Sequence, residues 1–242
     1  MNVLNQTIGE NFAIYNADCV EVFRNLATAS VDYSIFSPPF ASLYTYSNSP
    51  RDMGNVRNDT EFFENFDYLV RELVRVVKPG HNISFHCMLL PTSKERDGYI
   101  GLKDFRSDLI RAFQKHGAIF HSEVVIWKDP VTAMQRTKAL GLLHKTIRTN
   151  ATMCRQGIPD YLITMRTPGD VVDRCAHGAD LPVDEWQKLA SPVWMDINPS
   201  DTLQYASARD RDDERHICPL QLEVIRRGIR LWTRPGDVVA SP

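Results

Sequence analysis

The chain has 242 residues, of which 43% are hydrophobic and 24% charged, and its formal net charge is −2. A chain of this length and apolar content buries a sizeable core, as one large domain or a domain with an insertion, which excludes a mainly disordered protein. The near-neutral charge excludes a uniformly basic nucleic-acid-binding coat, so any contact with nucleic acid has to come from a local patch.

The first third of the chain predicts a strand, a helix and a second strand in turn. These elements cover residues 12–16, 20–26 and the apolar run 31–36. Asp18 follows the first strand and Ser37 the second. Because ligands of parallel α/β sheets bind at the carboxyl ends of strands, Asp18 and Ser37 are candidate site residues.

The alternation of helices and strands continues over the next part of the chain. Asn58 is a predicted helix N-cap, and the helix after it is expected to end at the Pro-Gly pair 79–80. Residues 82–88 are a predicted buried strand, Asp104 caps a second amphipathic helix, and residues 119–127 form another strand. This order predicts an α/β fold with a mostly parallel sheet.

The periodic pattern weakens between residues 128 and 215, apart from a predicted strand at 161–165. Six cations and one anion lie between residues 128 and 155. This local excess of positive charge is the best candidate for contact with phosphates, and a solvated surface loop is the alternative. The cations are Lys128, Arg136, Lys138, Lys145, Arg148 and Arg155.

Cysteine spacing and the N-terminal sequence indicate the compartment. The five cysteines lie far apart without a C-x-x-C pair, which favours reduced thiols and argues against a structural zinc or other metal site. Residues 1–12 lack a signal-peptide pattern, and no apolar run approaches the ~18 residues of a membrane span. We expect a soluble, cytoplasmic protein without membrane contact.

The most informative motif is Ser37-Pro38-Pro39-Phe40, directly behind the apolar run. Two consecutive prolines fix two φ angles and hold the preceding residue extended, so the loop is rigid where it leaves the strand. A stiff turn without a chemical role is the alternative interpretation.

This tetrapeptide resembles the Asp/Asn/Ser-Pro-Pro-Tyr/Phe signature of enzymes that methylate exocyclic amino nitrogens with S-adenosylmethionine. Serine in first place, followed by phenylalanine, most resembles the N4-cytosine DNA methyltransferases. Other segments look like their counterparts in that family and come in the order of its permuted beta class. They are residues 16–19, 51–55, 75–80, 216–221 and 234–239.

The resemblance implies a Rossmann-like methyltransferase sheet with helices on both faces and an inserted target-recognition region. Residues 1–127 would be the catalytic part, 128–215 the target-recognition region with one returning sheet strand, and 216–242 the start of the cofactor-binding part. In the family the last strand runs into a glycine loop, whereas this sequence stops at Ser241-Pro242. We therefore expect a fold that is incomplete at its C-terminus.

The resemblance also assigns roles to the catalytic loop. Ser37 and the backbone carbonyl of Pro38 or Pro39 would accept hydrogen bonds from the amino group of a base rotated out of the duplex, and Phe40 would stack on the ring. Positioning and desolvation would supply the catalysis, without a covalent enzyme intermediate.

Contacts with S-adenosylmethionine and DNA are implied in the same way. The expected cofactor contacts are Asp18, Cys19, His216, Cys218, Pro219, Ser241 and Pro242. Capping of a helix explains Asp18 equally well, and the first turn of a helix also favours Pro219. Arg51 and the six cations are expected to contact DNA, although the loop of Arg51 can also simply cap itself. His86 is predicted to be a hydrogen-bonded core histidine.

The expected reaction transfers a methyl group from S-adenosylmethionine to N4 of cytosine in a specific duplex DNA sequence. N6 of adenine is the alternative target, and serine in the motif favours cytosine. A catalytically inactive DNA-binding fragment, or methylation of RNA or of a protein amide, are the further alternatives. The resemblance implies a prokaryotic or phage protein, with a cognate restriction enzyme that makes no physical contact.

Overall fold

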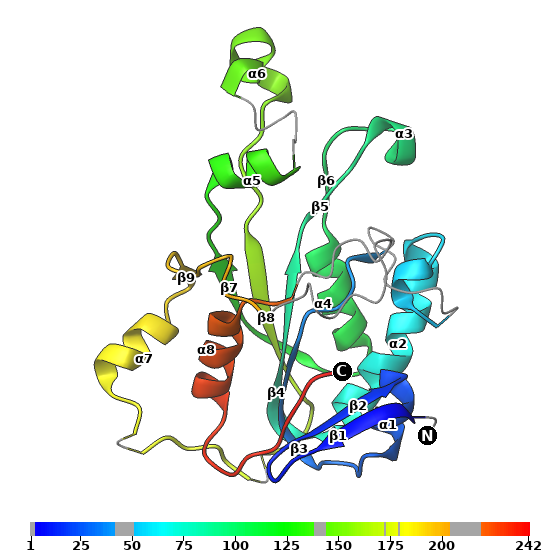
Figure 1. Cartoon of the computed structure of the whole chain (residues 1–242), viewed down its shortest axis with the longest axis vertical. Coiled ribbons are helices and arrows are strands. Elements are labelled where there is room, and N and C mark those ends of the chain that lie inside the picture. The colour runs from blue at the N-terminus through cyan, green and yellow to red at the C-terminus, as the bar shows by residue number, and fades with distance from the viewer. Residues whose placement is uncertain (1–2, 42–50, 138–143, 172, 179, 204–218) are drawn as a thin grey trace.

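A six-stranded sheet forms the centre of the computed structural model (Figure 1). The structure describes residues 3–41, 51–137, 144–171, 173–178, 180–203 and 219–242. The strand order is β10-β3-β4-β8-β7-β9. The strands are β3 (Val31–Phe36), β4 (Val77–Met88), β7 (Ile119–Ile126), β8 (Asp160–Arg166), β9 (Val193–Trp194) and β10 (Val239–Ala240). Only β8 runs against its neighbours in this sheet, which confirms the mostly parallel α/β prediction.

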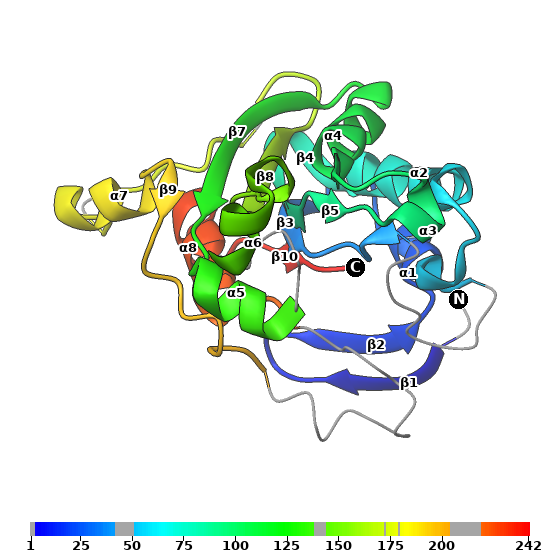
Figure 2. The same ribbon diagram turned by 90° about the horizontal axis from the view of Figure 1, so that it is seen from above.

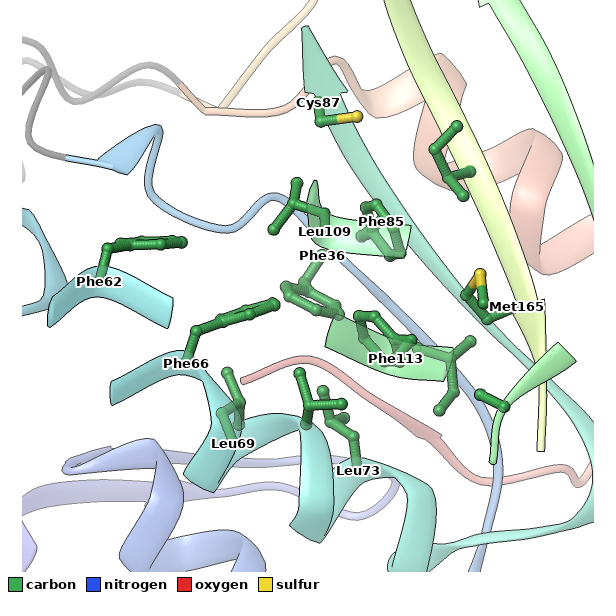
Figure 3. Close-up of a cluster of buried hydrophobic side chains, with 14 of the residues drawn as sticks. Phe36, Phe62, Phe66, Leu69, Leu73, Phe85, Cys87, Leu109, Phe113 and Met165 are labelled. Atoms are coloured by element: carbon green, nitrogen blue, oxygen red, sulfur yellow. The ribbon is translucent and has the colours of Figure 1, made fainter. Parts of the chain in front are cut away.

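Three helices cover one face of the sheet, namely α1 (Cys19–Asn25), α2 (Asp59–Val76) and α4 (Phe105–Lys115). Aromatic rings fill the space between α2, α4 and the sheet (Figure 3). The rings of Phe85 and Phe113 stack with centroids 5.1 Å apart, and those of Phe62 and Phe66 stack at 5.6 Å. The apolar spacing seen in the sequence therefore marks the inward faces of both helices correctly.

Both predicted N-caps are confirmed. The side-chain oxygen of Asn58 accepts a hydrogen bond from the Glu61 amide at 3.0 Å, and that of Asp104 accepts one from the Ser107 amide at 3.2 Å. Each carboxyl or amide oxygen thus satisfies one of the free N–H groups in the first turn.

The predicted boundary at the Pro-Gly pair 79–80 is wrong, because α2 already ends at Val76 and β4 begins at Val77. Tertiary pairing decides this boundary, since Val77 pairs with Val31 of β3. Gly80 lies within the strand at a φ of 74°. The Thr167 hydroxyl donates to the Lys78 carbonyl at 2.6 Å and so satisfies a backbone group at this irregular point.

The opposite face is covered by α8 (Leu222–Trp232), which confirms the prediction of helices on both faces (Figure 1). Val224 packs there with Tyr33 and Ile35. A Cβ atom on Gly228 would lie 2.7 Å from both the Ile35 Cδ1 and the Tyr33 hydroxyl, so the close approach of helix and sheet requires glycine. The short helix α7 (Val183–Leu189) packs beside α8.

A hairpin of β1 (Val3–Ile8) and β2 (Ala13–Ala17) stands apart from the central sheet (Figure 2). β2 corresponds to the predicted strand 12–16, but it pairs antiparallel with β1 alone. Its side chains, including the apolar Ile14 and Tyr15, are mostly exposed, so β2 buries no face as a central strand does. Asp18 consequently follows a hairpin strand rather than a strand of the central sheet.

Two groups of short elements extend from the sheet at the end where β4 stops and β8 begins (Figures 1 and 2). β4 leads into β5 (Leu90–Pro91), α3 (Lys94–Asp97) and β6 (Leu102–Lys103). β7 leads into α5 (Pro130–Thr137), α6 (His144–Thr149) and a 3-10 turn (Ala151–Met153), and β8 then returns to the sheet. β8 corresponds to the strand predicted at 161–165, and the two-residue β9 also pairs, with β7.

The edge strand β10 is attached through a buried carboxylate. Asp32 accepts a hydrogen bond from the Val238 amide at 2.9 Å, and the Lys78 ammonium lies 2.5 Å from its other oxygen. Val239 and Ala240 pair with Tyr33 and Ser34. The carboxyl ends of β10 and β3 therefore lie side by side.

Candidate functional site

The tetrapeptide at residues 37–40 leaves the sheet at the carboxyl end of β3. Phe36 pairs with Phe85 in the register of β3 and β4, so Ser37 comes to lie beside His86. Ser37 is exposed, whereas Pro38 is buried. The loop is anchored at its far end by the buried Ala41, whose φ of 50° is unfavourable for a residue with a Cβ atom. The loop thus leaves Ser37 exposed at the carboxyl end of β3.

Phe40 is half-buried and packs against the edge of the core. Its ring centroid lies 5.9 Å from that of His86 and 6.4 Å, edge to face, from that of Phe105. These contacts hold the ring beside Ser37. Stacking of Phe40 on a nucleobase stays a prediction.

A chain of polar side chains extends from Ser37 across the sheet. The Ser37 hydroxyl oxygen lies 3.1 Å from Nδ1 of His86. Nε2 of His86 lies 3.1 Å from Oδ2 of Asp160, and the Lys128 ammonium lies 2.5 Å from Oδ1 of the same carboxylate. His86 and Asp160 are only 7% and 3% exposed. Two residues within strands β4 and β8 and two in the loops after β3 and β7 therefore form one continuous polar row.

The strand registers explain why these residues meet. His86 of β4 is opposite Leu162 of β8, so Asp160, two residues along β8, faces the same side of the sheet. Asp160 is in turn opposite Ile126 of β7, and Lys128 lies two residues further on. Alternation of side chains along strands places all of these groups on one face at one edge.

Asp160 remains a carboxylate although it is buried. Burial pushes the pKa of Asp160 upward, but the adjoining His86 and Lys128 outweigh this effect and hold the pKa below its usual range. The contact with His86 is oblique, because Nε2 of His86 has no aligned hydrogen-bond partner. Oδ1 of Asp160, which faces Lys128, also lacks an aligned partner. The row is thus held by charge as much as by aligned hydrogen bonds.

Sequence reasoning found part of this row. His86 is buried and hydrogen-bonded, as predicted, although its partner is the candidate catalytic serine. Lys128 was assigned to the phosphate-contacting patch, and its ammonium is bound to Asp160. Asp160 was missed; the available signal was an acidic residue at the start of an apolar strand, which is unusual for a buried position.

Asp18 is the N-cap of α1. Its Oδ1 accepts from the Glu21 amide at 3.1 Å, and its Oδ2 lies 3.2 Å from the Arg51 guanidinium, which also pairs with Glu21. Burial, reinforced by the charge of Asp18, raises the pKa of the neighbouring Cys19 thiol to about 11. The capping role of Asp18 is confirmed. The predicted cofactor contacts of Asp18 and Cys19, and the DNA contact of Arg51, stay predictions.

The remaining predicted cofactor residues lie near the C-terminus. Ser241 and Pro242 follow β10, at the sheet edge that also carries Ser37. Pro219 precedes α8, whose N-cap is Gln221, so it lies outside the first turn of the helix. His216 and Cys218 lie outside the described residues.

The other predicted DNA contacts lie on or near the short helices beyond the sheet. Lys145 and Arg148 are exposed on α6. Arg155 is half-buried and donates a hydrogen bond to the Gln156 carbonyl at 3.1 Å. Arg136 belongs to α5, and Lys138 lies outside the described residues.

Neither a metal cluster nor a membrane-crossing helix occurs among the described residues. No group of three or more His, Cys, Asp or Glu side chains there is arranged to hold a metal ion. Among the helices that the structure describes, none has the length and apolar composition that crossing a membrane requires.

Comparison with known proteins identifies the fold. No protein-family model and no curated protein sequence matches the chain. A candidate DNA modification methylase from Thermus thermophilus, solved with S-adenosyl-L-methionine, is 20% identical and superposes with a TM-score of 0.66 over 93% of this chain and 76% of its own. The PvuII DNA methyltransferase, described as cytosine-N4-specific, is 15% identical with a TM-score of 0.66 over 99% of this chain and 77% of its own. The chain thus has the Rossmann-like fold of DNA methyltransferases, as the sequence resemblance predicted.

Proposed function

We propose that this protein is an S-adenosylmethionine-dependent DNA methyltransferase whose target is the exocyclic N4 of cytosine. The observation that carries the proposal is the exposed residue Ser37 on a diproline loop at the carboxyl end of β3. This is the edge of an α/β sheet where ligands bind. The methyltransferase fold and the sequence motif support the same assignment independently.

The loop suits a reaction at an amino group. The lone pair of an exocyclic amine is delocalised into the base, so the nitrogen is a weak nucleophile. Acceptors that bind its N–H groups hold the nitrogen in one orientation for in-line attack. Ser37 Oγ and a carbonyl of Pro38 or Pro39 are the acceptors, and Phe40, fixed by Phe105 and His86, provides the stacking surface.

S-adenosylmethionine, when bound, supplies an electrophilic methyl group on a sulfonium. The residues present fit this cofactor by the chemistry of their donors. Asp18 uses Oδ1 to cap α1, and its Oδ2, now paired with the exposed Arg51, is available to accept from a hydroxyl or amino group. Ser241 and Pro242 continue the strand that lies beside β3, which brings a ligand held there next to Ser37.

Duplex DNA is the proposed substrate, and α5 and α6 are the proposed contact region. Lys145 and Arg148 on α6 are exposed cations at the end of the sheet that carries the catalytic loop. Contacts with phosphates position a duplex without reading its sequence. Serine in the motif favours cytosine N4 over adenine N6.

The test uses the 242-residue chain with radiolabelled S-adenosylmethionine and mixed-sequence duplex DNA made by amplification, which carries no earlier methylation. We expect calorimetric binding of the cofactor and transfer of label to DNA. Label in RNA or in protein instead of DNA would contradict the substrate assignment. Salt-dependent DNA binding without any cofactor binding would identify an inactive DNA-binding protein.

A further inference from the structure

We propose that His86, Asp160 and Lys128 are positioning residues that fix the Ser37 hydroxyl as a hydrogen-bond acceptor toward the substrate. The purpose of this arrangement rests on the proposed methyltransferase function. The placement of the hydrogen atoms, however, is a property of the free protein and is measurable without DNA or cofactor.

Asp160 determines which nitrogen of His86 carries a hydrogen. An ionised carboxylate only accepts hydrogen bonds, so the imidazole nitrogen that faces it must carry the hydrogen. That nitrogen is Nε2 of His86, at 3.1 Å from Oδ2. In a neutral imidazole the second nitrogen is then an acceptor. With the ring neutral, which is part of the proposal, the Ser37 hydroxyl 3.1 Å from Nδ1 donates its only hydrogen to His86.

This placement determines what Ser37 offers a ligand. A hydroxyl has one donor hydrogen and two acceptor lone pairs. Because the hydrogen is committed to His86, the exposed side of Ser37 presents lone pairs alone. The hydroxyl becomes equivalent to an acceptor oxygen of an aspartate or asparagine side chain, the residues that replace serine in the related motifs.

Lys128 keeps the row in this state. Its ammonium lies 2.5 Å from Oδ1 of Asp160, at a position where burial would otherwise favour the protonated acid. A protonated Asp160 would donate to Nε2 and move the imidazole hydrogen to Nδ1. The N–H at Nδ1 would then donate to one lone pair of the Ser37 oxygen. The Ser37 hydrogen would be free to point toward the substrate.

The oblique contact of His86 with Asp160 is typical of a site whose hydrogen bonds become aligned only when substrate binds. Buried polar atoms without an aligned partner are uncommon, and Nε2 of His86 and Oδ1 of Asp160 are two of them in one row. Hydrogen bonds of catalytic groups are often poorly aligned in ligand-free proteins and tighten with substrate.

The consequence is selection among bases. A Ser37 oxygen that only accepts binds the N–H of an exocyclic amino group, as in cytosine or adenine. It repels the carbonyl oxygen that thymine or uracil carries at the position of the cytosine amino group, because two acceptors would then face each other. His86, Asp160 and Lys128 thus act on specificity through Ser37 without touching the base.

Long-range ¹H–¹⁵N spectra of the labelled, ligand-free protein test the hydrogen placement directly, because they distinguish the two imidazole tautomers. The chain has seven histidines, and the His86→Gln spectrum identifies the signal that belongs to His86. We expect the Nε2–H tautomer at pH 7.5. Ser37→Ala, at an exposed position, should shift the Nδ1 resonance and leave the tautomer unchanged. An Nδ1–H tautomer or a doubly protonated ring in the wild type would overturn the proposal.

Asp160→Asn should move the hydrogen to Nδ1, because the Lys128 ammonium holds the amide oxygen at the Oδ1 position and the amide NH2 then faces Nε2. The matched control is Asp67→Asn: Asp67 lies 2.8 Å from both the His116 Nε2 and the Lys115 ammonium, and so reproduces the same residue types on α2 and α4. The control should leave the His86 signal unchanged. A His86 signal that moves equally in both variants would overturn the proposal.

The kinetic measurement separates this inference from the proposed function. We expect Asp160→Asn to lower kcat for methyl transfer by about tenfold to a hundredfold, with KM for DNA nearly unchanged, and Asp67→Asn to leave both unchanged. Full activity of Asp160→Asn with an inverted tautomer would overturn the positioning role. The predicted tautomer in a wild type that transfers no methyl group would support the hydrogen placement and contradict the methyltransferase function.

Discussion

The Ser37 hydroxyl lies 3.1 Å from Nδ1 of His86, although the two residues are 49 positions apart in the chain. Parallel pairing of β3 with β4 creates this contact, because Phe36 is opposite Phe85. A stiff turn with no chemical role would need no buried imidazole behind its exposed hydroxyl. The contact therefore favours a chemical role for the diproline loop.

Cofactor binding should distinguish two aspartates that both cap helices. Asp18→Ala and Asp104→Ala each remove a cap bond, at 3.1 and 3.2 Å, and each should lower the free energy of unfolding by about 1 kcal/mol. Only Asp18→Ala should also weaken the binding of S-adenosylmethionine, because Oδ2 of Asp18 is a proposed contact. Urea unfolding and calorimetry measure the two effects; equal cofactor affinity in both variants would remove Asp18 from the site.

The exposed cations on α6 should contribute to DNA affinity through phosphates alone. Replacing Lys145 and Arg148 with alanine should weaken binding to all duplexes alike and reduce the slope of log K against log salt by about 0.9 for each phosphate that is no longer neutralised. The control replaces Arg71 and Arg111, which are exposed on α2 and α4. If the slope of log K against log salt were the same in the α6 variant and the wild type, α6 would not contact the DNA phosphates.

Gly228→Ala should destabilise the packing of α8 on the sheet by about 1–3 kcal/mol, as overpacking of a core does. The added methyl would lie 2.7 Å from the Ile35 side chain and the Tyr33 hydroxyl. Adding Tyr33→Phe, which removes that hydroxyl, should recover part of the loss. Chemical denaturation of the single and double variants measures this coupling, and a more stable Gly228→Ala protein would contradict the described helix position.

Glu223 should contribute to stability against acid. Hydrogen bonds from Arg226 and Arg227, partly offset by burial, lower the pKa of Glu223 from 4.5 to about 2. Because the folded-state pKa is depressed, the stabilisation is fully present above pH 4.5 and is lost as pH falls toward 2. Glu223→Gln should thus lower Tm above pH 4.5, and the Tm values of variant and wild type should converge near pH 2. As a control, Glu64→Gln at an exposed position should leave Tm unchanged over the same pH range.

Local signals predicted much of the fold. Asn58 and Asp104 mark helix starts because capping depends on neighbouring residues only, and the apolar run 31–36 is the strand that the structure contains. The end of α2 and the partner of β2 could not be predicted in this way. Both are decided by pairing with distant strands, which overrides the local breaker at residues 79–80.

The exposed end of the candidate site was predicted, whereas the contacts that join its buried residues were not. The motif at residues 37–40 is contiguous and has a physical signature. His86, Asp160 and Lys128 meet only because β4, β8 and β7 adopt particular registers. A shift of one residue in either pairing would move Asp160 to the other face, and a single sequence contains no direct record of that register.

The base product formed by the wild type and by Ser37→Ala shows whether Ser37 binds the amino group of the target base. After incubation with S-adenosylmethionine, amplified duplex DNA is digested to nucleosides and analysed by mass spectrometry. We predict N4-methylcytosine from the wild type and a loss of about a hundredfold in Ser37→Ala, with folding unchanged because the side chain is exposed. Formation of N6-methyladenine instead would show that the target is adenine and not cytosine. Methylation that is unaffected by the loss of Ser37, or a product methylated on ring carbon, would contradict the account.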